Sequence, residues 1–203
     1  DKKGGLAMST VVACGMFSAI SGSSIATAAT MSKVAMPEMR RYKYADSLAT
    51  ASIAAGGTLG ILIPPSVILV IYGLLTEQSI GKLFMAGFLP GMLGILFYTL
   101  AVFFVVSRNP SLGPAGEKTN WPERLLALKN VWTTLTLFIF VIGGIYIGLF
   151  SATEAAGMGA AGALIIAISS GNLKISEYFN VLREASVLAA KLFALLFGAT
   201  MFS

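Results

Sequence analysis

The feature of this sequence that most limits its fold is a long apolar run without charge near its beginning. From Gly5 to Ser32 there is no charged side chain. Further apolar runs follow, and several reach or approach the roughly 20 residues that cross a ~30 Å hydrocarbon core. Their hydrophobicity is continuous and does not alternate with a period of two, as the strands of a membrane barrel would. The sequence therefore predicts an all-α integral membrane protein with several helical spans.

Composition supports this fold class and excludes several kinds of chemistry. Of the 203 residues, 56% are hydrophobic and only 11% are charged, whereas about a quarter are charged in typical soluble domains. The chain has no His, which excludes both His-based catalytic triads and metal sites with His ligands. Its one cysteine, Cys14, is expected to be a small buried packing residue. The net charge of +5 requires no nucleic-acid partner, because Lys and Arg gather in the cytoplasmic loops of membrane proteins.

Within the first apolar block, the small polar residues Ser21–Ser24, "SGSS", interrupt the hydrophobic pattern. Basic residues flank the block on both sides, at Lys2 and Lys3 and again within residues 33–43, which the positive-inside tendency disfavours for a single span. Two halves of roughly 12 to 15 residues, ~20 Å of helix each, are too short to cross. We therefore expect a re-entrant helical hairpin over about residues 5–36. A kink or a packing surface is the alternative interpretation.

A second irregular segment, "GGTLGILIPPS" at Gly56–Ser66, interrupts the next apolar block, about residues 45–75. It holds three glycines and a Pro-Pro pair. Pro costs ~3 kcal/mol inside a helix and moves the preceding residue out of the helical region. Non-helical backbone at bilayer depth is tolerated only where protein or a water-filled cavity satisfies it. We expect a broken helix here, with a simple proline hinge as the alternative.

The middle of the chain is expected to leave and re-enter the apolar phase. Residues 79–107 predict a short helix that Ser79 caps and that stops near Pro90, followed by a transmembrane helix. Residues 108–130 contain three prolines and several basic residues, and predict a cytoplasmic loop with a surface helix.

The last third, residues 131–203, predicts further transmembrane helices. The first is expected at 131–150, and the next is expected to begin after an N-cap at Thr153. Glu154 then lies in the first turn, where it either stabilises the helix dipole or acts as a functional intramembrane carboxylate. Residues 172–184 show amphipathic spacing and are expected to lie along the membrane surface before a last helix.

Together, the two irregular segments predict a binding site. A hairpin tip beside a broken helix exposes helix ends, whose amides favour an anionic carboxylate and whose carbonyl and hydroxyl oxygens suit a small hard cation. An oxygen set without carboxylates fits Na⁺ better than a divalent metal. A serine nucleophile would lack a base, so we expect no enzyme. A channel is a closer competitor, although the sequence has no repeated filter or charged ring.

At these residues the chain resembles the large membrane subunit of TRAP (tripartite ATP-independent periplasmic) transporters, the DctM-like family. The motifs that carry the resemblance are "GGLAMSTVVACGMFSAISGSSIATAAT", "MPEMRRYKY", "AAGGTLGILIPPSVILVIYG" and "EQSIGKLFMAGFLPG", in that order, and more weakly "SATEAAGMGAAGAL". No Met precedes Asp1, and the sequence at Ser203 is still apolar. We therefore expect an internal fragment of such a subunit.

The resemblance implies a Na⁺-coupled secondary importer of organic acids such as C4-dicarboxylates, with an elevator-type fold of inverted repeats in a bacterial or archaeal inner membrane. It implies a periplasmic substrate-binding protein and a small membrane subunit as partners, and no cofactor besides the coupling ion. Residues 1–78 would be the transport-domain part of the first repeat, 79–107 an arm helix and a transmembrane helix, and 131–203 the start of the second repeat. A channel-like or scaffold subunit without coupled transport is the alternative.

The resemblance also implies which residues bind the solute and the ion. Thr27 stands where some relatives have an acidic residue, which leaves the substrate class open. Substrate and cation binding would fall to Ser21, Gly22, Ser23, Ser24, Thr27, Gly56, Gly57, Thr58, Gly60, Pro64, Pro65 and Ser66. Of these, the Na⁺ candidates are Ser21, Ser23, Ser24, Gly57 and Thr58.

Overall fold

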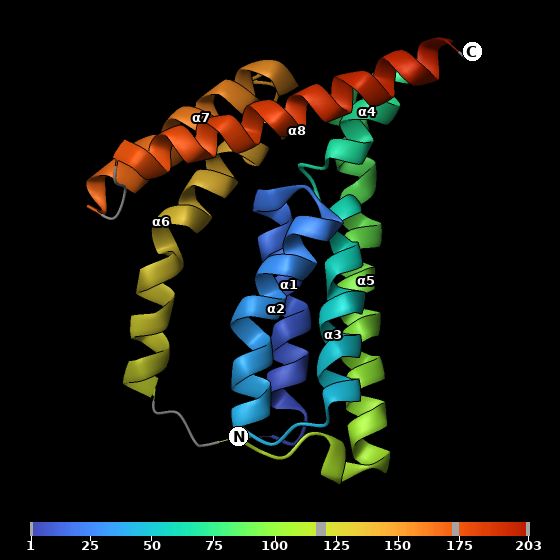
Figure 1. The fold of residues 1–203 in the computed structure, drawn as a ribbon, viewed down its shortest axis with the longest axis vertical. Helices are drawn as coiled ribbons and strands as arrows, with labels where there is room; N and C mark the ends of the chain where they lie inside the picture. The colour runs from blue at the N-terminus through green and yellow to red at the C-terminus, as the bar shows by residue number, and fades with distance from the viewer. Residues whose placement is uncertain (1, 117–120, 172–174, 202–203) are drawn as a thin grey trace. The chain divides into compact units, whose positions relative to one another are not determined.

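The structure, a computed structural model, describes the backbone of residues 2–116, 121–171 and 175–201 (Figure 1). Every regular element in these ranges is a helix. The chain divides into two compact units, Asp1–Trp132 and Thr133–Ser203. The all-α fold class that the sequence predicts is confirmed.

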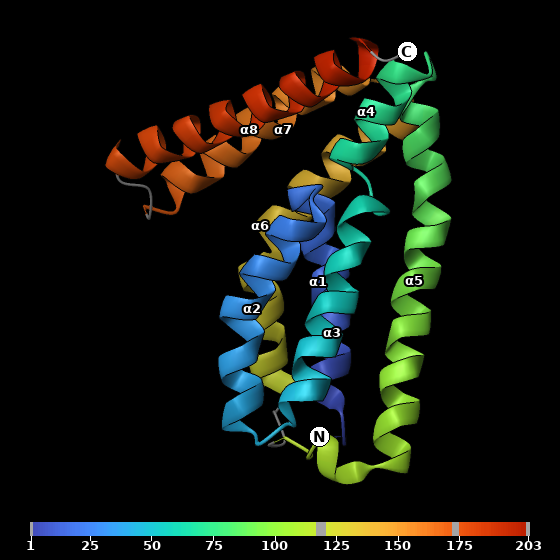
Figure 2. The ribbon, with the colours of Figure 1, turned by 45° about the vertical axis from the view of Figure 1, so that its right-hand side comes forward.

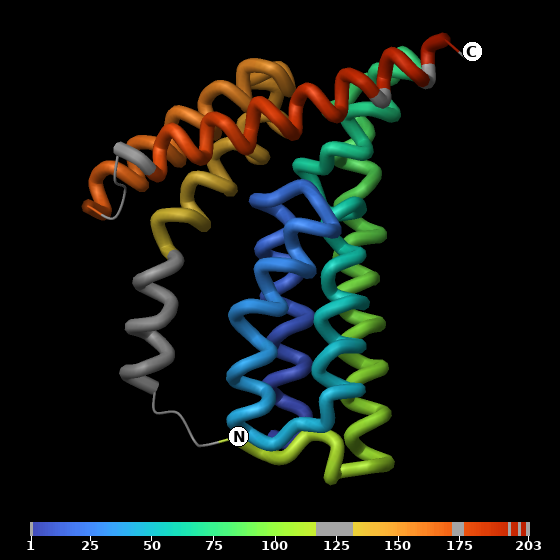
Figure 3. The backbone as a smooth tube through the Cα atoms, viewed as in Figure 1, coloured from blue at the N-terminus to red at the C-terminus, as the bar shows by residue number. Residues whose placement is uncertain are grey.

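The first unit begins with a helical hairpin of α1 (Gly5–Ser21) and α2 (Ser24–Arg41). The chain reverses direction at the two residues between them (Figure 3). With 17 and 18 residues, the two helices are longer than the expected 12 to 15, and α2 continues through Pro37. Its neighbours Ala35 and Met39 are packed into the core, which holds the helix together across the missing N–H. At ~1.5 Å per residue, each helix still rises only about 25 Å.

The broken helix consists of α3 (Asp46–Thr58), a 3₁₀ turn η1 (Leu59–Ile61) and α4 (Val67–Leu75). Helix α3 packs against both helices of the hairpin (Figures 1 and 2). The break itself occupies residues 62–66 and contains a cis peptide between Pro64 and Pro65. The predicted broken helix is present, but the irregular segment Gly56–Ser66 is not unwound from its first residue. Residues 56–58 are still helical, and Gly56 and Gly57 pack closely on the hairpin.

Helix α5 (Ile80–Arg108) is one continuous helix of 29 residues. The predicted stop near Pro90 was wrong, and no separate short helix precedes the span. Pro90 removes one backbone hydrogen bond, but the glycines that flank it hold α5 against the broken helix. A Cβ on Gly87 would lie 2.7 Å from the carbonyl oxygen of Leu62, and one on Gly91 would lie 2.7 Å from the Ile63 side chain. Tertiary packing thus outweighs the local signal of the proline.

A 3₁₀ turn η2 (Pro110–Leu112) follows α5 and is tied to two earlier segments. The Gly4 N–H donates to the Gly113 carbonyl at 2.8 Å, and the Ala45 N–H donates to the Leu112 carbonyl at 3.0 Å. These bonds close the end of the first unit that lies away from the hairpin tip. Residues 117–120 of the expected loop 108–130 lie outside the described residues.

The described helices after this loop are α6 (Trp121–Tyr146), α7 (Ala152–Ser169) and α8 (Ile175–Met201). The predicted surface helix is not separate, because α6 runs from Trp121 into the apolar segment without a break. Likewise α8 is one helix from Ile175, whereas residues 172–174 of the predicted surface segment lie outside the described residues. The loop between α7 and its predecessor includes Gly148 with a φ of 77°.

The N-cap of α7 is Ser151, not Thr153 as predicted. Ser151 and Glu154 form a capping box in which the Ser151 N–H donates to a Glu154 carboxylate oxygen at 2.8 Å and the Glu154 N–H donates to Ser151 Oγ at 3.3 Å. Two reciprocal bonds outweigh the single cap that Thr153 could provide. Of the two interpretations of Glu154, its contacts match the structural one.

Small residues let α7 approach α6 in the second unit. A Cβ on Gly162 would lie 2.5 Å from the Leu137 side chain, and Ala155 is only 1% exposed. Small residues allow such a close approach of two helices.

Two helices within the described residues are long and apolar enough to cross a membrane by length and composition, α5 and α7. Helix α1 and the Trp132–Tyr146 part of α6 are shorter apolar helices. Large side chains on α5 point outward, with Phe97 60% and Phe103 56% exposed. In water such a surface would be costly, whereas in a bilayer it contacts lipid chains.

Candidate substrate and cation site

The hairpin tip lies against the break in the second helix. Gly22 has a left-handed φ of 60° and ends α1, with its N–H donating to the Ser18 carbonyl at 2.9 Å. Its own carbonyl accepts from the Val67 N–H, the first amide of α4, at 3.2 Å. A Cβ on Gly22 would lie 2.7 Å from the Pro65 carbonyl oxygen. Both the backbone conformation and the close approach therefore require glycine.

The other side of the tip packs on the 3₁₀ turn. A Cβ on Gly60 would lie 2.7 Å from the carbonyl carbon and oxygen of Ser23 and from the amide nitrogen of Ser24. One turn earlier, a Cβ on Gly57 would lie 2.8 Å from the Ala28 Cβ. The ends of α1, α2, η1 and α4 thus meet at one place, where helix-end amides and carbonyls gather.

A small cluster of oxygens lies inside the hairpin tip. The hydroxyl oxygens of Ser21 and Thr27 are 2.7 Å apart, and the Thr27 hydroxyl donates to the Ser23 carbonyl at 2.8 Å. The Ser21 hydroxyl also lies 3.4 Å from that carbonyl oxygen. Thr27 is fully buried, at 0% exposed. The three oxygens carry no formal charge, so the cluster offers hard neutral ligands to a cation.

Ser66 spans the break from the other side. Its hydroxyl donates to the Ile61 carbonyl at 2.8 Å and accepts from the Leu69 N–H at 3.4 Å. The side chain is only 1% exposed. It therefore satisfies the last carbonyl of η1 and caps α4, so that protein groups satisfy the backbone on both sides of the break.

Comparison with known proteins identifies the family. The chain matches the family model of the tripartite ATP-independent periplasmic transporter DctM component over residues 1–203. The chain belongs to this family. The resemblance that the sequence motifs carry is thereby confirmed.

Several curated relatives of this DctM-family chain are large permease proteins of TRAP transporters. The C4-dicarboxylate permease DctM of Pseudomonas aeruginosa is 37% identical over 99% of the chain and 47% of its own length. The ectoine permease TeaC of Halomonas elongata is 36% identical over 99% of the chain and 47% of its length. The sialic acid permease SiaM of Vibrio cholerae is 32% identical over 98% and 46%. The chain thus spans about half the length of these relatives, which are transporter permeases and not enzymes.

In this DctM-family structure, most of the predicted site residues lie together, and a few lie apart from them. The tip and the break bring most of them together: Ser21, Gly22, Ser23, Ser24, Thr27, Gly60, Pro65 and Ser66. Pro64 is fully buried in the break. Gly56 packs deeper, where its Cβ would lie 2.8 Å from both Cβ and Sγ of Cys14. Gly57 lets α3 approach α2 closely at Ala28, and its role in binding stays a prediction.

Thr58 is placed apart from the tip hydroxyls. Its hydroxyl donates to the Ala55 carbonyl at 2.7 Å and lies 3.1 Å from the Tyr98 hydroxyl on α5. Sequence reasoning did not include Tyr98, and no local signal marks it, because the contact joins residues 40 positions apart. It also did not foresee that the Val67 amide bonds directly to the tip, although a helix beginning after Pro-Pro signals free amides there.

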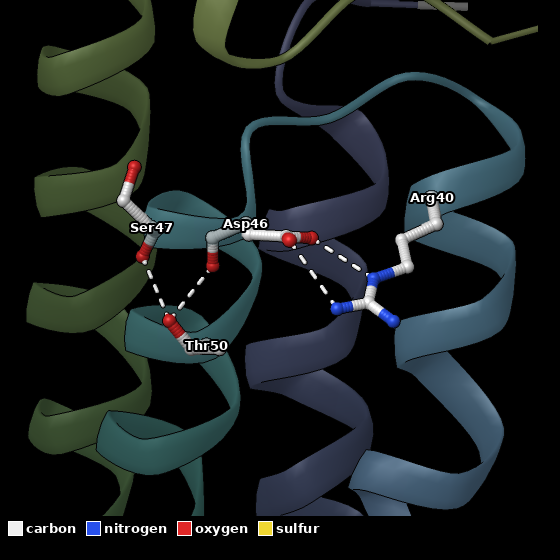
Figure 4. A network of polar contacts seen from close by, with 4 residues as sticks. All are labelled: Arg40, Asp46, Ser47 and Thr50. Carbon is white, nitrogen blue, oxygen red and sulfur yellow. Dashed lines mark hydrogen bonds and ion pairs between the residues drawn. The ribbon is translucent and has the colours of Figure 1, made fainter.

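A separate polar network lies at the other end of the hairpin (Figure 4). The Arg40 guanidinium donates to both carboxylate oxygens of Asp46, at 3.0 and 3.2 Å. Nearby, the Thr50 hydroxyl donates to the Asp46 carbonyl at 2.7 Å. The side-chain hydrogen bond and the charge of Arg40 lower the pKa of Asp46 below its usual value. The pair fastens the α2–α3 connection and is one helix length from the tip, so it takes no part in the site.

Proposed function

We propose that this chain supplies one half of the substrate and cation site of a Na⁺-coupled importer of organic acids. The observation that carries the proposal is the junction of hairpin tip and broken helix, marked by the bond from the Val67 amide to the Gly22 carbonyl at 3.2 Å. Beside it lies the neutral oxygen cluster of Ser21, Ser23 and Thr27.

The charge pattern around the junction supports coupling of a cation to an anion. Residues 5–32 and 47–76 contain no charged side chain, so these segments bring no fixed charge to neutralise a ligand. Burying a lone carboxylate in such surroundings is costly, and a bound cation next to it offsets part of that cost. The N-termini of α2 and α4 favour the carboxylate, whereas the carbonyl ends of α1 and η1 and the hydroxyls favour Na⁺.

The substrate is proposed only as a class. The relatives named above handle C4-dicarboxylates, ectoine and sialic acid. A small organic acid with at least one carboxylate fits helix-end amides and needs no basic side chain in this half of the site.

The setting of this site is part of the proposal. We place the chain in the inner membrane as a multi-pass subunit that works with a periplasmic substrate-binding protein and a small membrane subunit. An elevator movement would carry the tip, the break and α3 as one body, because these elements contact one another through backbone atoms.

The test uses the full-length permease with its small subunit in proteoliposomes. A thermal-shift screen of the cognate binding protein first identifies the solute. We then expect uptake of that solute, radiolabelled, to need both an inward Na⁺ gradient and the binding protein. Uptake that survives removal of both would refute coupled transport. Ionic current through the reconstituted complex without bound solute would favour the channel-like alternative.

A further inference from the structure

The end of the first unit opposite the hairpin tip gathers three segments, residues 2–6, 38–46 and 106–113. Besides the two backbone bonds of η2, the Leu6 N–H donates to the Tyr44 hydroxyl at 3.2 Å. A Cβ on Gly4 would lie 3.0 Å from the Val106 side chain. Figures 1 and 2 show the start of α1, the end of α2 and the end of α5 at this end of the unit. Charges on these segments therefore act on one surface.

This surface is strongly basic. The three segments carry six basic side chains and two carboxylates, and all six basic side chains are exposed. We call these six the basic rim: Lys2, Lys3, Arg40, Arg41, Lys43 and Arg108. Both carboxylates are paired within it, Asp46 with Arg40 at 3.0 Å and Glu38 with Arg41 at 3.7 Å. A surplus of four positive charges remains on the described residues of the rim.

The other end of α5 shows no such surplus. Between residues 47 and 107 the charged residues are Glu77 and Lys82, one of each sign. The charge asymmetry thus runs along the length of α5, from a balanced end at Lys82 to the basic rim at Arg108. Over 26 residues these two side chains are separated by about 39 Å of helix.

Arg108 joins the rim to the apolar face of α5. Its guanidinium carbon lies 4.4 Å from the centroid of the Phe104 ring, and Phe104 is 56% exposed. One turn before Phe104 in the helix, Leu100 is 49% exposed. An apolar column that ends in a cation matches a molecule with an acyl chain and an anionic head, because Arg binds phosphate oxygens while its planar face rests on the ring.

We propose that the basic rim binds the headgroup phosphates of anionic phospholipids, with Arg108 at its lipid-facing edge. The surplus charge attracts an anionic membrane surface, and the exposed column of α5 receives the acyl chains. The occupant is therefore a lipid and not free phosphate, which would leave the apolar column uncovered. The proposal does not depend on the transported solute or on Na⁺ coupling.

The test measures the thermal stability of the full-length permease in detergent while phosphatidylglycerol or phosphatidylcholine with the same oleoyl chains is added. We expect phosphatidylglycerol to raise the Tm at lower lipid concentration than phosphatidylcholine. Arg108→Gln should weaken the apparent affinity for phosphatidylglycerol about fivefold. Lys82→Gln is the matched control, because it removes one exposed positive charge from the same helix and should leave that affinity unchanged.

Three results would overturn the proposal. Equal shifts with the two lipids would show that headgroup charge is not recognised. Equal effects of the Arg108 and Lys82 variants would show that the rim is not the site. A full shift with sodium phosphate alone would show that the rim takes a free anion without an acyl chain. The Tm of each variant in phosphatidylcholine checks that it is folded, and Arg108→Lys, which keeps the charge, should retain most of the affinity.

Discussion

The close contact between Gly60 and the hairpin tip makes Gly60→Ala the sharpest test of the site. The added methyl would lie 2.7 Å from three backbone atoms of Ser23 and Ser24, well inside the 3.4 Å of ordinary van der Waals contact. Backbone cannot turn away as a flexible side chain can, so the tip and the 3₁₀ turn must separate by about 0.7 Å. Overpacking of this kind costs about 1–3 kcal/mol.

The perturbation should appear in both stability and transport. A cost of 1–3 kcal/mol shifts an equilibrium by about 5- to 150-fold, so we expect a lower unfolding free energy of the full-length permease and a loss of uptake in proteoliposomes. Gly5→Ala is the matched control in the same hairpin, since nothing lies within 4 Å of its Cβ position. If Gly60→Ala and Gly5→Ala have the same stability and uptake, the tip and the break do not form the close junction described above.

Three further predictions concern single side chains. Thr27→Val keeps the shape of the side chain but removes the hydroxyl that bonds to the tip. It should cost about 1 kcal/mol of stability and weaken the dependence of uptake on Na⁺. Unchanged Na⁺ dependence would count against an ion at this cluster. Thr58→Val and Tyr98→Phe each remove the hydrogen bond between these two side chains, so both should lower stability by a similar amount, about 1 kcal/mol. A loss of Na⁺ affinity in Thr58→Val but not in Tyr98→Phe would instead indicate that Thr58 binds the ion. Because Arg40 lowers the pKa of Asp46, the pair stabilises the fold above the unfolded-state pKa of the carboxyl and is lost as pH falls through the lower folded-state pKa. Acid titration of unfolding should show a small loss that Asp46→Asn lacks, and identical pH profiles would refute it.

Local chemistry was enough to locate the irregular backbone. A small polar turn between two apolar halves and a Pro-Pro pair in an apolar block are features that neighbouring residues alone enforce. The structure has a turn at Gly22 and Ser23 and a break at residues 62–66. The re-entrant course of the hairpin in a membrane stays a prediction.

Local signals failed where packing competed with them. Pro90 predicts the end of a short helix, yet it lies inside the continuous helix α5, and α2 likewise continues through Pro37. A single proline costs a helix about 3 kcal/mol, which the burial of flanking residues against a neighbouring helix can outweigh. The N-cap of α7 was misplaced for a related reason, since two reciprocal bonds of Ser151 and Glu154 exceed the propensity of one residue.

By itself, the sequence determined the all-α class, the family and the two places where the helices break, because hydrophobic run length and the backbone limits of Gly and Pro act over a few residues. Only the tertiary structure decided which predicted residues meet. Gly60 and Ser23 touch, whereas Thr58, two residues before Gly60, contacts Tyr98 of α5. Successive residues of a helix point about 100° apart. Membership of the site therefore depends on the rotation of α3 and η1 against two neighbours, which packing fixes.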